Sequence, residues 1–112
     1  MKPRLHTDLW IKAHIRTCHA NNIPAFVVAR GDAERGGVLL KINHFKDGVE
    51  LLQPTTNMEG DRVWMPVMGK DVVDERSADA FIAKRRSTDS DLWVVEIEDN
   101  DGRYELGEQI DG

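Results

Sequence analysis

The chain has 112 residues and a net charge of −5 at pH 7, with 40% hydrophobic and 31% charged residues. These values exclude a disordered chain, and the length fits one domain with one core. No apolar run approaches the ~20 residues that span a bilayer, no signal-peptide stretch follows the N-terminal charges, and the single cysteine, Cys18, excludes an intramolecular disulfide. We therefore expect a single cytoplasmic domain over residues 1–112 with no membrane partner.

Charge is unevenly distributed along the chain. Residues 1–47 contain eight basic and four acidic side chains, whereas residues 89–112 contain one basic and nine acidic side chains. Acidic runs of this kind usually form a solvated strand face and a tail, and residues 107–112 are predicted to be a flexible acidic tail. The alternative is that the acidic end of one molecule meets the basic end of another copy, or a basic partner.

The first predicted element is a helix over residues 8–21. Thr7 or Asp8 can cap its first turn, and Asn21-Asn22 can end it because asparagine tolerates left-handed backbone. Its apolar residues cover a wide arc, which predicts burial against a sheet on one side and against the second helix or another subunit on the other. One face holds Ile11, His14, Ile15 and Cys18, the other holds Leu9, Ala13, Thr17 and Ala20, and Trp10 lies between them.

Four strands are predicted between this helix and the next one. A turn over residues 30–37, with glycines free to take positive φ, separates the first two, and Lys46-Asp47-Gly48 forms a tight turn before the third. The third strand should end at Pro54, and Pro66 should place part of the fourth at a sheet edge. The four strands cover residues 23–30, 38–45, 49–53 and 61–68.

A second helix is predicted from an N-cap at Ser77 to about Arg86. Ala78, Phe81 and Ile82 lie within one arc of this helix and should face the sheet. The helix therefore separates the first four strands from whatever follows it.

Residues 92–98 (LWVVEIE) give the clearest strand of the chain, because the alternation predicts one buried face. A hairpin turn at residues 100–102 and a short return strand over residues 103–106 should follow. The order α-β-β-β-β-α-β-β predicts an α+β fold, an antiparallel sheet of five to six strands with two helices packed on one face. The tryptophan-bearing face of the late strand holds Trp93, Val95 and Ile97, and the other face holds Val94, Glu96 and Glu98.

Five stretches of the chain match the pattern of a known family, and the closing one is the most specific. They are Trp10 to Arg16, Ile23-Pro24-Ala25, Arg30-Gly31-Asp32, Lys41 with Asn43, and Asp91 to Asp99 followed by Gly102-Arg103. On these residues the chain resembles the alphaproteobacterial domain-of-unknown-function family DUF1491 over nearly its whole length. The resemblance implies a bacterial cytosolic protein and supplies no catalytic residues.

His14 and Cys18 are the first candidates for chemistry, because their four-residue spacing places both on one helix face. This spacing can supply two zinc ligands, but the sequence has no C-x-x-C or H-E-x-x-H pattern to complete a site. A cysteine–histidine nucleophile pair is disfavoured as well, since Cys18 lies toward the C-terminal half of its helix, where the dipole opposes a thiolate. We expect a packed thiol beside an imidazole, with no metal and no cofactor.

A ligand-binding site is the second candidate. It would form where the Arg30–Gly37 loop meets the late strand, and Glu96 and Glu98 can act as paired carboxylates only if they do not simply face solvent. The glycines of this loop match no nucleotide-binding motif, because a strand rather than a helix follows them. The candidate ligand-binding residues are Arg30, Asp32, His44, Glu96 and Glu98.

Two further candidates concern phosphate and protein partners. Lys84, Arg85 and Arg86 form the only basic run and can bind phosphate, although they also suit the C-terminal end of the second helix. Trp10 and Trp64 are interface candidates, with Trp64 expected in an exposed setting near a loop. The acidic balance of the chain disfavours nucleic acid as a partner.

The function that these features favour is a non-enzymatic interaction module that self-associates or binds a protein partner, because an edge strand, a two-sided helix and opposed charges are present without a complete catalytic set. The alternative is a small enzyme or ligand-binding domain that uses the Arg30–Gly37 loop with Glu96 and Glu98. A nucleic-acid adaptor is the third interpretation.

Overall fold

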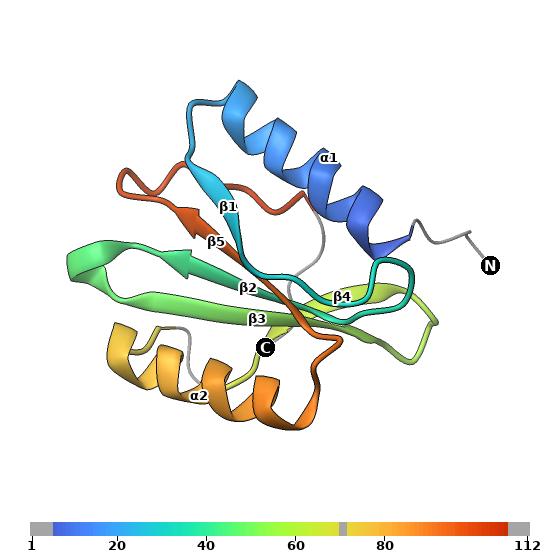
Figure 1. Cartoon of the computed structure of the whole chain (residues 1–112). Helices are drawn as coiled ribbons and strands as arrows, with labels where there is room; N and C mark the ends of the chain where they lie inside the picture. Colours follow the sequence, from blue (N-terminus) through green and yellow to red (C-terminus); the bar gives the residue numbers. More distant parts are fainter. Residues whose placement is uncertain (1–5, 70–71, 108–112) are drawn as a thin grey trace.

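The structure is a computed structural model that describes residues 6–69 and 72–107 (Figure 1). Of the expected tail over residues 107–112, all but Gly107 lies outside the described residues. The elements in chain order are α1 (Thr7–Ala20), β1 (Ala25–Ala29), β2 (Val38–Asn43), the 3-10 turn η1 (Phe45–Asp47), β3 (Val49–Thr56), β4 (Arg62–Pro66), α2 (Glu75–Thr88) and β5 (Trp93–Glu98).

The five strands form one mixed sheet in the order β1-β5-β2-β3-β4. β5 pairs antiparallel with β1 and parallel with β2, whereas β2, β3 and β4 pair antiparallel. The expectation of a purely antiparallel sheet is therefore wrong. Short turns dictate antiparallel pairing only between strands that follow each other, and β5 enters the sheet after α2, between two strands formed much earlier.

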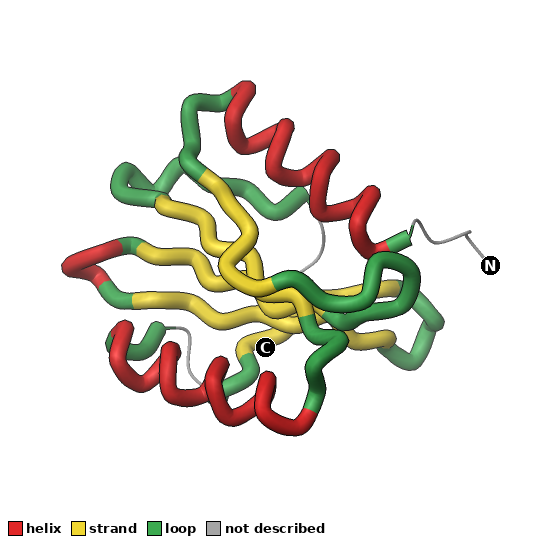
Figure 2. The backbone as a smooth tube through the Cα atoms, in the orientation of Figure 1, coloured by secondary structure: helices red, strands yellow, loops and turns green. Residues whose placement is uncertain are grey.

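The two helices lie on opposite faces of the sheet, not on one face as predicted. Figure 1 shows α1 above the sheet and α2 below it, and Figure 2 shows the strands as the middle layer. The physical reason is that the central strands are buried on both sides: every residue of β2 is buried, as are five of the six residues of β5. A single layer of helices would leave one of these faces in water.

Each helix covers its own core. The α1 side holds the Trp93, Val95 and Ile97 face of β5, so the predicted division of this strand into two faces is confirmed. The prediction that only one face is buried is wrong, because Val94 and Glu96 on the other face are buried under α2. On the α2 side, Phe81 and Ile82 pack against the buried Val94, as predicted for this helix. Other members of the α1-side core are Ile11, Cys18, Ile23, Ala25, Val38, Leu40, Ile42, Leu52, Trp64 and Leu106, and the α2 side adds Leu39, Val49, Leu51, Ala78 and Leu92.

The ends of both helices differ from the predictions in informative ways. His6 rather than Thr7 is the N-cap of α1, and Asn22 takes the left-handed conformation (φ 60°) after its end, as expected for asparagine. In α2 the N-cap is Asp74, whose carboxylate accepts hydrogen bonds from the Ser77 N–H and hydroxyl, so the cap lies three residues before the predicted one. The second apolar-leaning face of α1 (Leu9, Ala13, Thr17 and Ala20) is exposed.

The segment after β5 turns back as predicted but does not form a strand. Gly102 has a φ of 70° in the turn, and residues 103–106 adopt irregular structure. The Asp99 carboxylate accepts hydrogen bonds from the N–H groups of Arg103 and Tyr104, and Arg103 donates to the carbonyl of Asn21. These bonds take the place of a strand ladder. No helix in the described part of the chain is long and apolar enough to cross a membrane.

Candidate functional site

Exposed apolar side chains gather on and beside the edge strand β1, and we call Pro24, Phe26, Val28 and Phe45 the β1 strip. Phe26 is 43% exposed and Val28 is 50% exposed. Phe45, which is 47% exposed, lines a hollow of about 240 Å³ together with Pro24 and Glu98. Phe45 also has a φ of 59°, an uncommon conformation for a bulky residue, and its N–H donates to the Asn43 side chain. The structure therefore holds an aromatic ring in solvent at a strained position.

The backbone edge of β1 is protected against strand addition. The strand has five residues, and its register with β5 shifts between Val27 and Ala29, which marks a bulge. The Glu98 N–H donates to the Pro24 carbonyl, so the alternation of the ladder points the backbone groups of Ala25 away from β5. His19 Nε2 lies 3.0 Å from the Ala25 carbonyl oxygen and covers it. Such features hinder another strand from pairing with the edge of the sheet.

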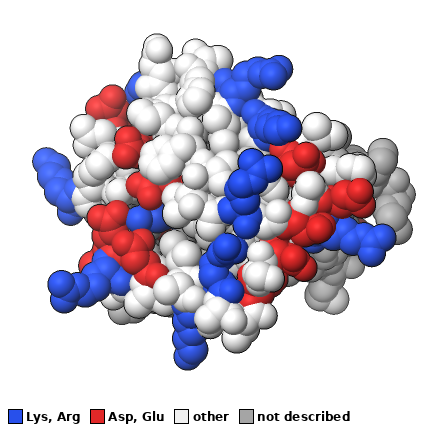
Figure 3. Space-filling view, in the orientation of Figure 1, with Lys and Arg blue, Asp and Glu red and all other residues white. Residues whose placement is uncertain are grey.

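Charges of opposite sign flank the β1 strip. Acidic residues Glu98, Asp99 and Asp101 line the hollow at its N-terminal end, together with Arg103. Arg30 directly follows the strand, and the Arg86 guanidinium lies 3.4 Å from its carbonyl oxygen. Figure 3 shows an uncharged area near β1, with acidic side chains on its left and Lys and Arg side chains toward the centre of the view.

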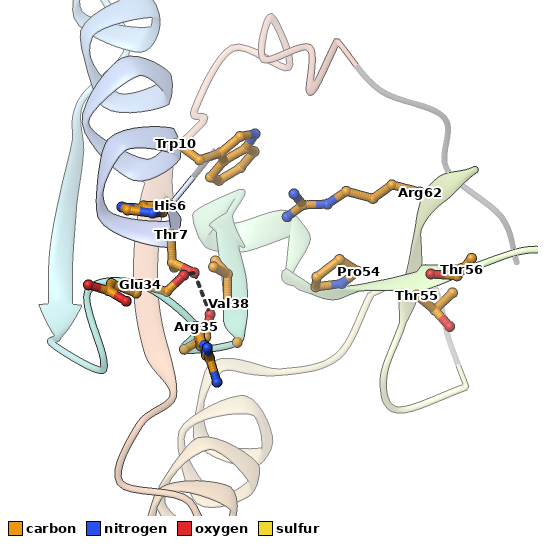
Figure 4. Close-up of a pocket in the computed structure, with 12 residues that line it drawn as sticks. His6, Thr7, Trp10, Glu34, Arg35, Val38, Pro54, Thr55, Thr56 and Arg62 are labelled. Atoms are coloured by element: carbon orange, nitrogen blue, oxygen red, sulfur yellow. Dashed lines mark hydrogen bonds between the residues drawn. The ribbon is translucent and has the colours of Figure 1, made fainter. Parts of the chain in front are cut away.

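A larger cavity of about 410 Å³ lies at the other side of the sheet, between the first turn of α1, residues 34–37, β3 and β4 (Figure 4). Its origin is Pro54. In an antiparallel ladder every second residue pair is hydrogen-bonded, and the bond from the His44 N–H to the Gly48 carbonyl shows which pairs these are. Leu40 and Leu52 form one such pair, and the next would be Val38 with Pro54. Pro54 has no N–H to donate, and β2 and β3 separate there. β3 continues to Thr56 with β4 alone.

The Arg30–Gly37 loop forms one wall of this cavity. The Asp32 carboxylate accepts hydrogen bonds from the N–H groups of Glu34 and Arg35, as expected for an aspartate that closes a turn. The loop glycines do not take positive φ. Gly31 and Gly36 instead allow a close approach, because a Cβ atom there would lie 2.0 and 2.2 Å from the Asp91 carbonyl oxygen.

Aromatic rings hold one arginine of the cavity in place. The Arg62 guanidinium lies 5.2 Å from the ring centre of Trp10 and 5.0 Å from that of Trp64, and the two indoles stack 5.3 Å apart. Figure 4 shows Arg62 reaching from β4 toward Trp10. The exposed setting expected for Trp64 is not found, because its side chain is fully buried in the α1-side core. Trp10 is half-buried and lines the cavity.

The five predicted ligand-binding residues are not brought together. Arg30 and Asp32 lie at the end of β5 that carries Trp93, since Arg30 stacks on that ring at 5.4 Å and the Asp32 carbonyl accepts the indole N–H at 2.7 Å. Glu98 lies five residues further along β5, or ~16 Å away. His44 lies at that far end, and Glu96 is buried in between. The loop therefore has no shared site with Glu96 and Glu98.

Glu96 belongs to a buried polar network under α2. The Lys41 ammonium is almost buried and lies 2.8 Å from Glu75, 2.9 Å from Asp79 and 3.2 Å from Glu96. Asn43 Nδ2 lies 3.4 Å from the other Glu96 oxygen. Burial alone lowers the pKa of Lys41, but the hydrogen bonds to the carboxylates outweigh it and raise that pKa above its ordinary value. The lysine thus fastens α2 to the sheet as an ammonium group paired with three carboxylates.

His44 joins three segments at the far end of the sheet. Its Nε2 lies 2.8 Å from Glu50, and its Nδ1 lies 3.2 Å from the Asp99 carbonyl and 3.5 Å from the Asp99 carboxylate. Partial burial lowers the pKa of His44, but the contacts with Glu50 and Asp99 outweigh it, so the pKa lies above its ordinary value. The imidazole holds the turn after β5 against β2 and β3.

The basic run is divided between solvent and internal contacts. Lys84 is exposed, whereas Arg85 donates to Gln53 at 3.1 Å and stacks on Phe81. Arg86 donates to the carbonyl oxygen of Ser90 at 3.2 Å. Two of the three side chains therefore connect α2 to neighbouring segments, and the run does not present three cations to one phosphate.

His14 and Cys18 have separate environments in the fold. Cys18 is 3% exposed, and burial raises the pKa of its thiol. The His14 ring stacks on Trp10 and is hydrogen-bonded to the hydroxyl of Tyr104. Within residues 6–69 and 72–107, no group of three or more His, Cys, Asp or Glu side chains is arranged to hold a metal ion.

The chain is similar to a defined family and to structures solved by experiment. A family model described as "Protein of unknown function (DUF1491)" matches residues 5–107. A crystal structure of a DUF1491 family protein from Caulobacter crescentus CB15 is 36% identical, with a TM-score of 0.85 over 96% of this chain and 100% of that chain.

Two solution structures are similar as well. An NMR structure of a DUF1491 family protein from the same organism is 35% identical, with a TM-score of 0.81 over 99% of this chain and 100% of that one. The solution structure of protein Atu0922 from A. tumefaciens is 26% identical, with a TM-score of 0.74 over 94% of this chain and 91% of that one. No curated protein matches the chain.

Proposed function

Because the chain belongs to the DUF1491 family, which is described as a family of unknown function, we propose a function from its own surface. It is a non-enzymatic interaction module that acts as one domain and self-associates through the β1 strip. The observation that carries this proposal is the exposure of Phe26 and Val28 on an edge strand, with the strained and exposed Phe45 near Pro24 at the N-terminal end of that strand. Exposed apolar residues that adjoin one another mark interaction surfaces more often than scattered ones do.

The partner that fits this surface is a second copy of the chain. A two-fold axis near Val27 runs two β1 strands antiparallel, and it sets the N-terminal end of one beside the C-terminal end of the other. The acidic side chains of Glu98 and Asp101 then face Arg30 and its neighbour Arg86 of the other copy, and the same contact is made twice. This complementarity favours a closed dimer over an open chain of molecules.

Side-chain packing rather than strand pairing supplies the stability of this dimer. The bulge after Val27 and the His19 contact to Ala25 interrupt the backbone edge. An aromatic side chain presents ~200 Å², so the exposed 43% of Phe26 is about 90 Å². At ~25 cal/mol per Å², its burial contributes about 2 kcal/mol per copy, or about 4 kcal/mol per dimer. That is roughly a 1000-fold effect on Kd.

Sedimentation equilibrium of three proteins tests the proposal. Phe26→Ser should shift the wild-type dimer to monomer, whereas Leu9→Ser should leave it intact. Leu9 is a matched control, because it is 49% exposed and lies on the exposed second face of α1. The dimer should also weaken as NaCl rises to about 0.5 M. A strictly monomeric wild type, or a dimer that only Leu9→Ser disrupts, would contradict this function.

We also infer a cytoplasmic location and an alphaproteobacterial source for the chain. The Caulobacter crescentus and A. tumefaciens origins of the similar structures support the source. Cell fractionation tests the location, with the tagged chain expected beside a cytosolic marker and recovery in the membrane or periplasmic fraction opposing it.

A further inference from the structure

We propose that the cavity between α1, residues 34–37, β3 and β4 binds a small organic anion, a carboxylate or phosphate joined to a compact apolar body. This site is separate from the β1 strip, because β1 and β4 are the opposite edges of the sheet. The inference therefore goes beyond self-association and does not depend on it.

The size and lining of the cavity suit such a ligand. Its volume of about 410 Å³ lies within the ~300–1,000 Å³ typical of small-molecule sites. The Trp10 ring, Val38 and Pro54 supply apolar surface, and Thr55 and Thr56 of β3 also line the cavity (Figure 4). The polar groups beside this apolar surface can orient a ligand as well as bind it.

The charge of the lining is positive, although the whole chain carries −5. Arg35 and Arg62 line the cavity with a single carboxylate, Glu34. Figure 4 shows Glu34 across the cavity from Arg62, so the two do not neutralise each other directly. A ligand with one or two negative charges would restore the local balance.

The stacking of Arg62 favours an anion with two adjacent oxygens, which both a planar carboxylate and a tetrahedral phosphate provide. Trp10 and Trp64 lie within about 5 Å of the guanidinium and fix its orientation, so a ligand meets the edge of the group. The N–H donors of that edge match two oxygens of a carboxylate or phosphate. Arg62 has other contacts as well, and an anion would join or displace them.

The first turn of α1 takes no part in the binding through its dipole. The Thr7 N–H lies 3.4 Å from the Glu34 carbonyl, and the Asp8 N–H donates to the Ala33 carbonyl at 2.9 Å. The Thr7 hydroxyl donates to the Gly36 carbonyl at 2.7 Å. These donors are occupied by the loop, so the affinity for an anion rests on the side chains of Arg35 and Arg62.

Titrations followed by NMR of ¹⁵N-labelled protein test the proposal. Benzoate, phenyl phosphate and inorganic phosphate are the anionic probes, and benzyl alcohol is the neutral probe of matched shape. Benzoate or phenyl phosphate should shift the Trp10 indole N–H with a saturable curve, and the stronger of the two identifies the preferred oxyanion. Benzyl alcohol should bind at least ~10-fold more weakly, because it lacks the charge-assisted hydrogen bonds.

Variants locate the binding. Arg35→Gln and Arg62→Gln should each weaken it ~10-fold, while Arg16→Gln, an exposed arginine outside the cavity, should not. If Arg62→Gln fails to fold, the affinity of Arg35→Gln tests the proposal alone, because the Arg35 side chain is exposed and its replacement should not disturb folding. No binding of any anionic probe, equal binding of benzyl alcohol, or equal effects of Arg35→Gln and Arg16→Gln would overturn the proposal. The oligomeric state should stay unchanged throughout, so failure here leaves the β1 dimer standing.

Discussion

Replacing Lys41 by methionine should destabilise the protein strongly, and the structure says which partner is responsible. The Glu75 and Asp79 side chains are 55% and 58% exposed, so water can solvate them once the ammonium is gone. Glu96 is only 12% exposed and would remain as a buried carboxylate with Asn43 as its remaining side-chain contact among the described residues. The loss of stability in Lys41→Met therefore comes mainly from leaving the buried Glu96 carboxylate without its cation.

The magnitude follows from this division. Breaking a buried ion pair costs ~3–5 kcal/mol, while an exposed pair contributes ~0–1 kcal/mol. Because the methionine side chain still fills the apolar part of the site, we expect the lower end, about 3 kcal/mol. For a chain of this length that corresponds to a fall in Tm of roughly 12 °C. It is a large share of the ~5–15 kcal/mol that stabilises a typical domain.

Urea unfolding of a double-mutant cycle measures the effect. The single variant Lys41→Met should lose about 3 kcal/mol, and Lys41→Met with Glu96→Gln should recover at least about half of it, because the stranded charge is removed. Asp79→Asn serves as the control and should cost less than about 1 kcal/mol. A Lys41→Met protein as stable as the wild type, or a double variant without recovery, would refute this account of how α2 is held.

Three further predictions follow from single sites. His44 has a raised pKa, so the stability it contributes is fully present below its unfolded value of 6.5 and is lost as pH rises through the higher folded value. The free energies of urea unfolding of wild type and His44→Gln should therefore converge above that pH, and a difference that grows with pH would contradict the role of His44 in holding the turn after β5. Gly36→Ala should cost ~1–3 kcal/mol, because its Cβ would lie 2.2 Å from the Asp91 carbonyl oxygen, whereas Gly37→Ala meets only a flexible side chain at 3.4 Å; equal thermal stability of the two variants would argue against the close approach. Cys18, buried with a raised pKa, should resist thiol reagents in the folded protein and react on unfolding, and rapid native labelling would be inconsistent with its burial.

The late strand could be predicted from its sequence, but its surroundings could not. Alternation around Trp93 identified β5 and assigned its two faces, and the structure confirms both. Alternation does not say what covers the second face, and Glu96 reads as solvent-facing until Lys41 is known to lie beside it. The paired apolar residues Val94 and Val95 were the available signal of a strand buried on both sides, since an exposed face would not need Val94.

The pairings between strands that lie far apart in the sequence are the second feature that could not be predicted. The parallel contact of β2 with β5 joins residues more than 50 positions apart, and no local pattern encodes it. The separation of Asp32 from Glu98 follows from the antiparallel β1–β5 pairing, which places Asp32 beside Asp91 and Glu98 beside Pro24. The prediction that the third strand ends at Pro54 is wrong, because β3 continues to Thr56 beside β4. The proline does mark the place where the pairing of β3 with β2 stops, and the cavity opens there.

Self-association through β1 is the central claim, and ¹H–¹⁵N spectra of the protein over a concentration series test it most directly. On dilution, the amide signals of Phe26, Val28 and Phe45 should move together along one binding curve, while Leu9 on α1 and Met58 on the β3–β4 turn should stay in place. Spectra that do not change with concentration, or shifts that centre on α1 instead, would contradict the claim.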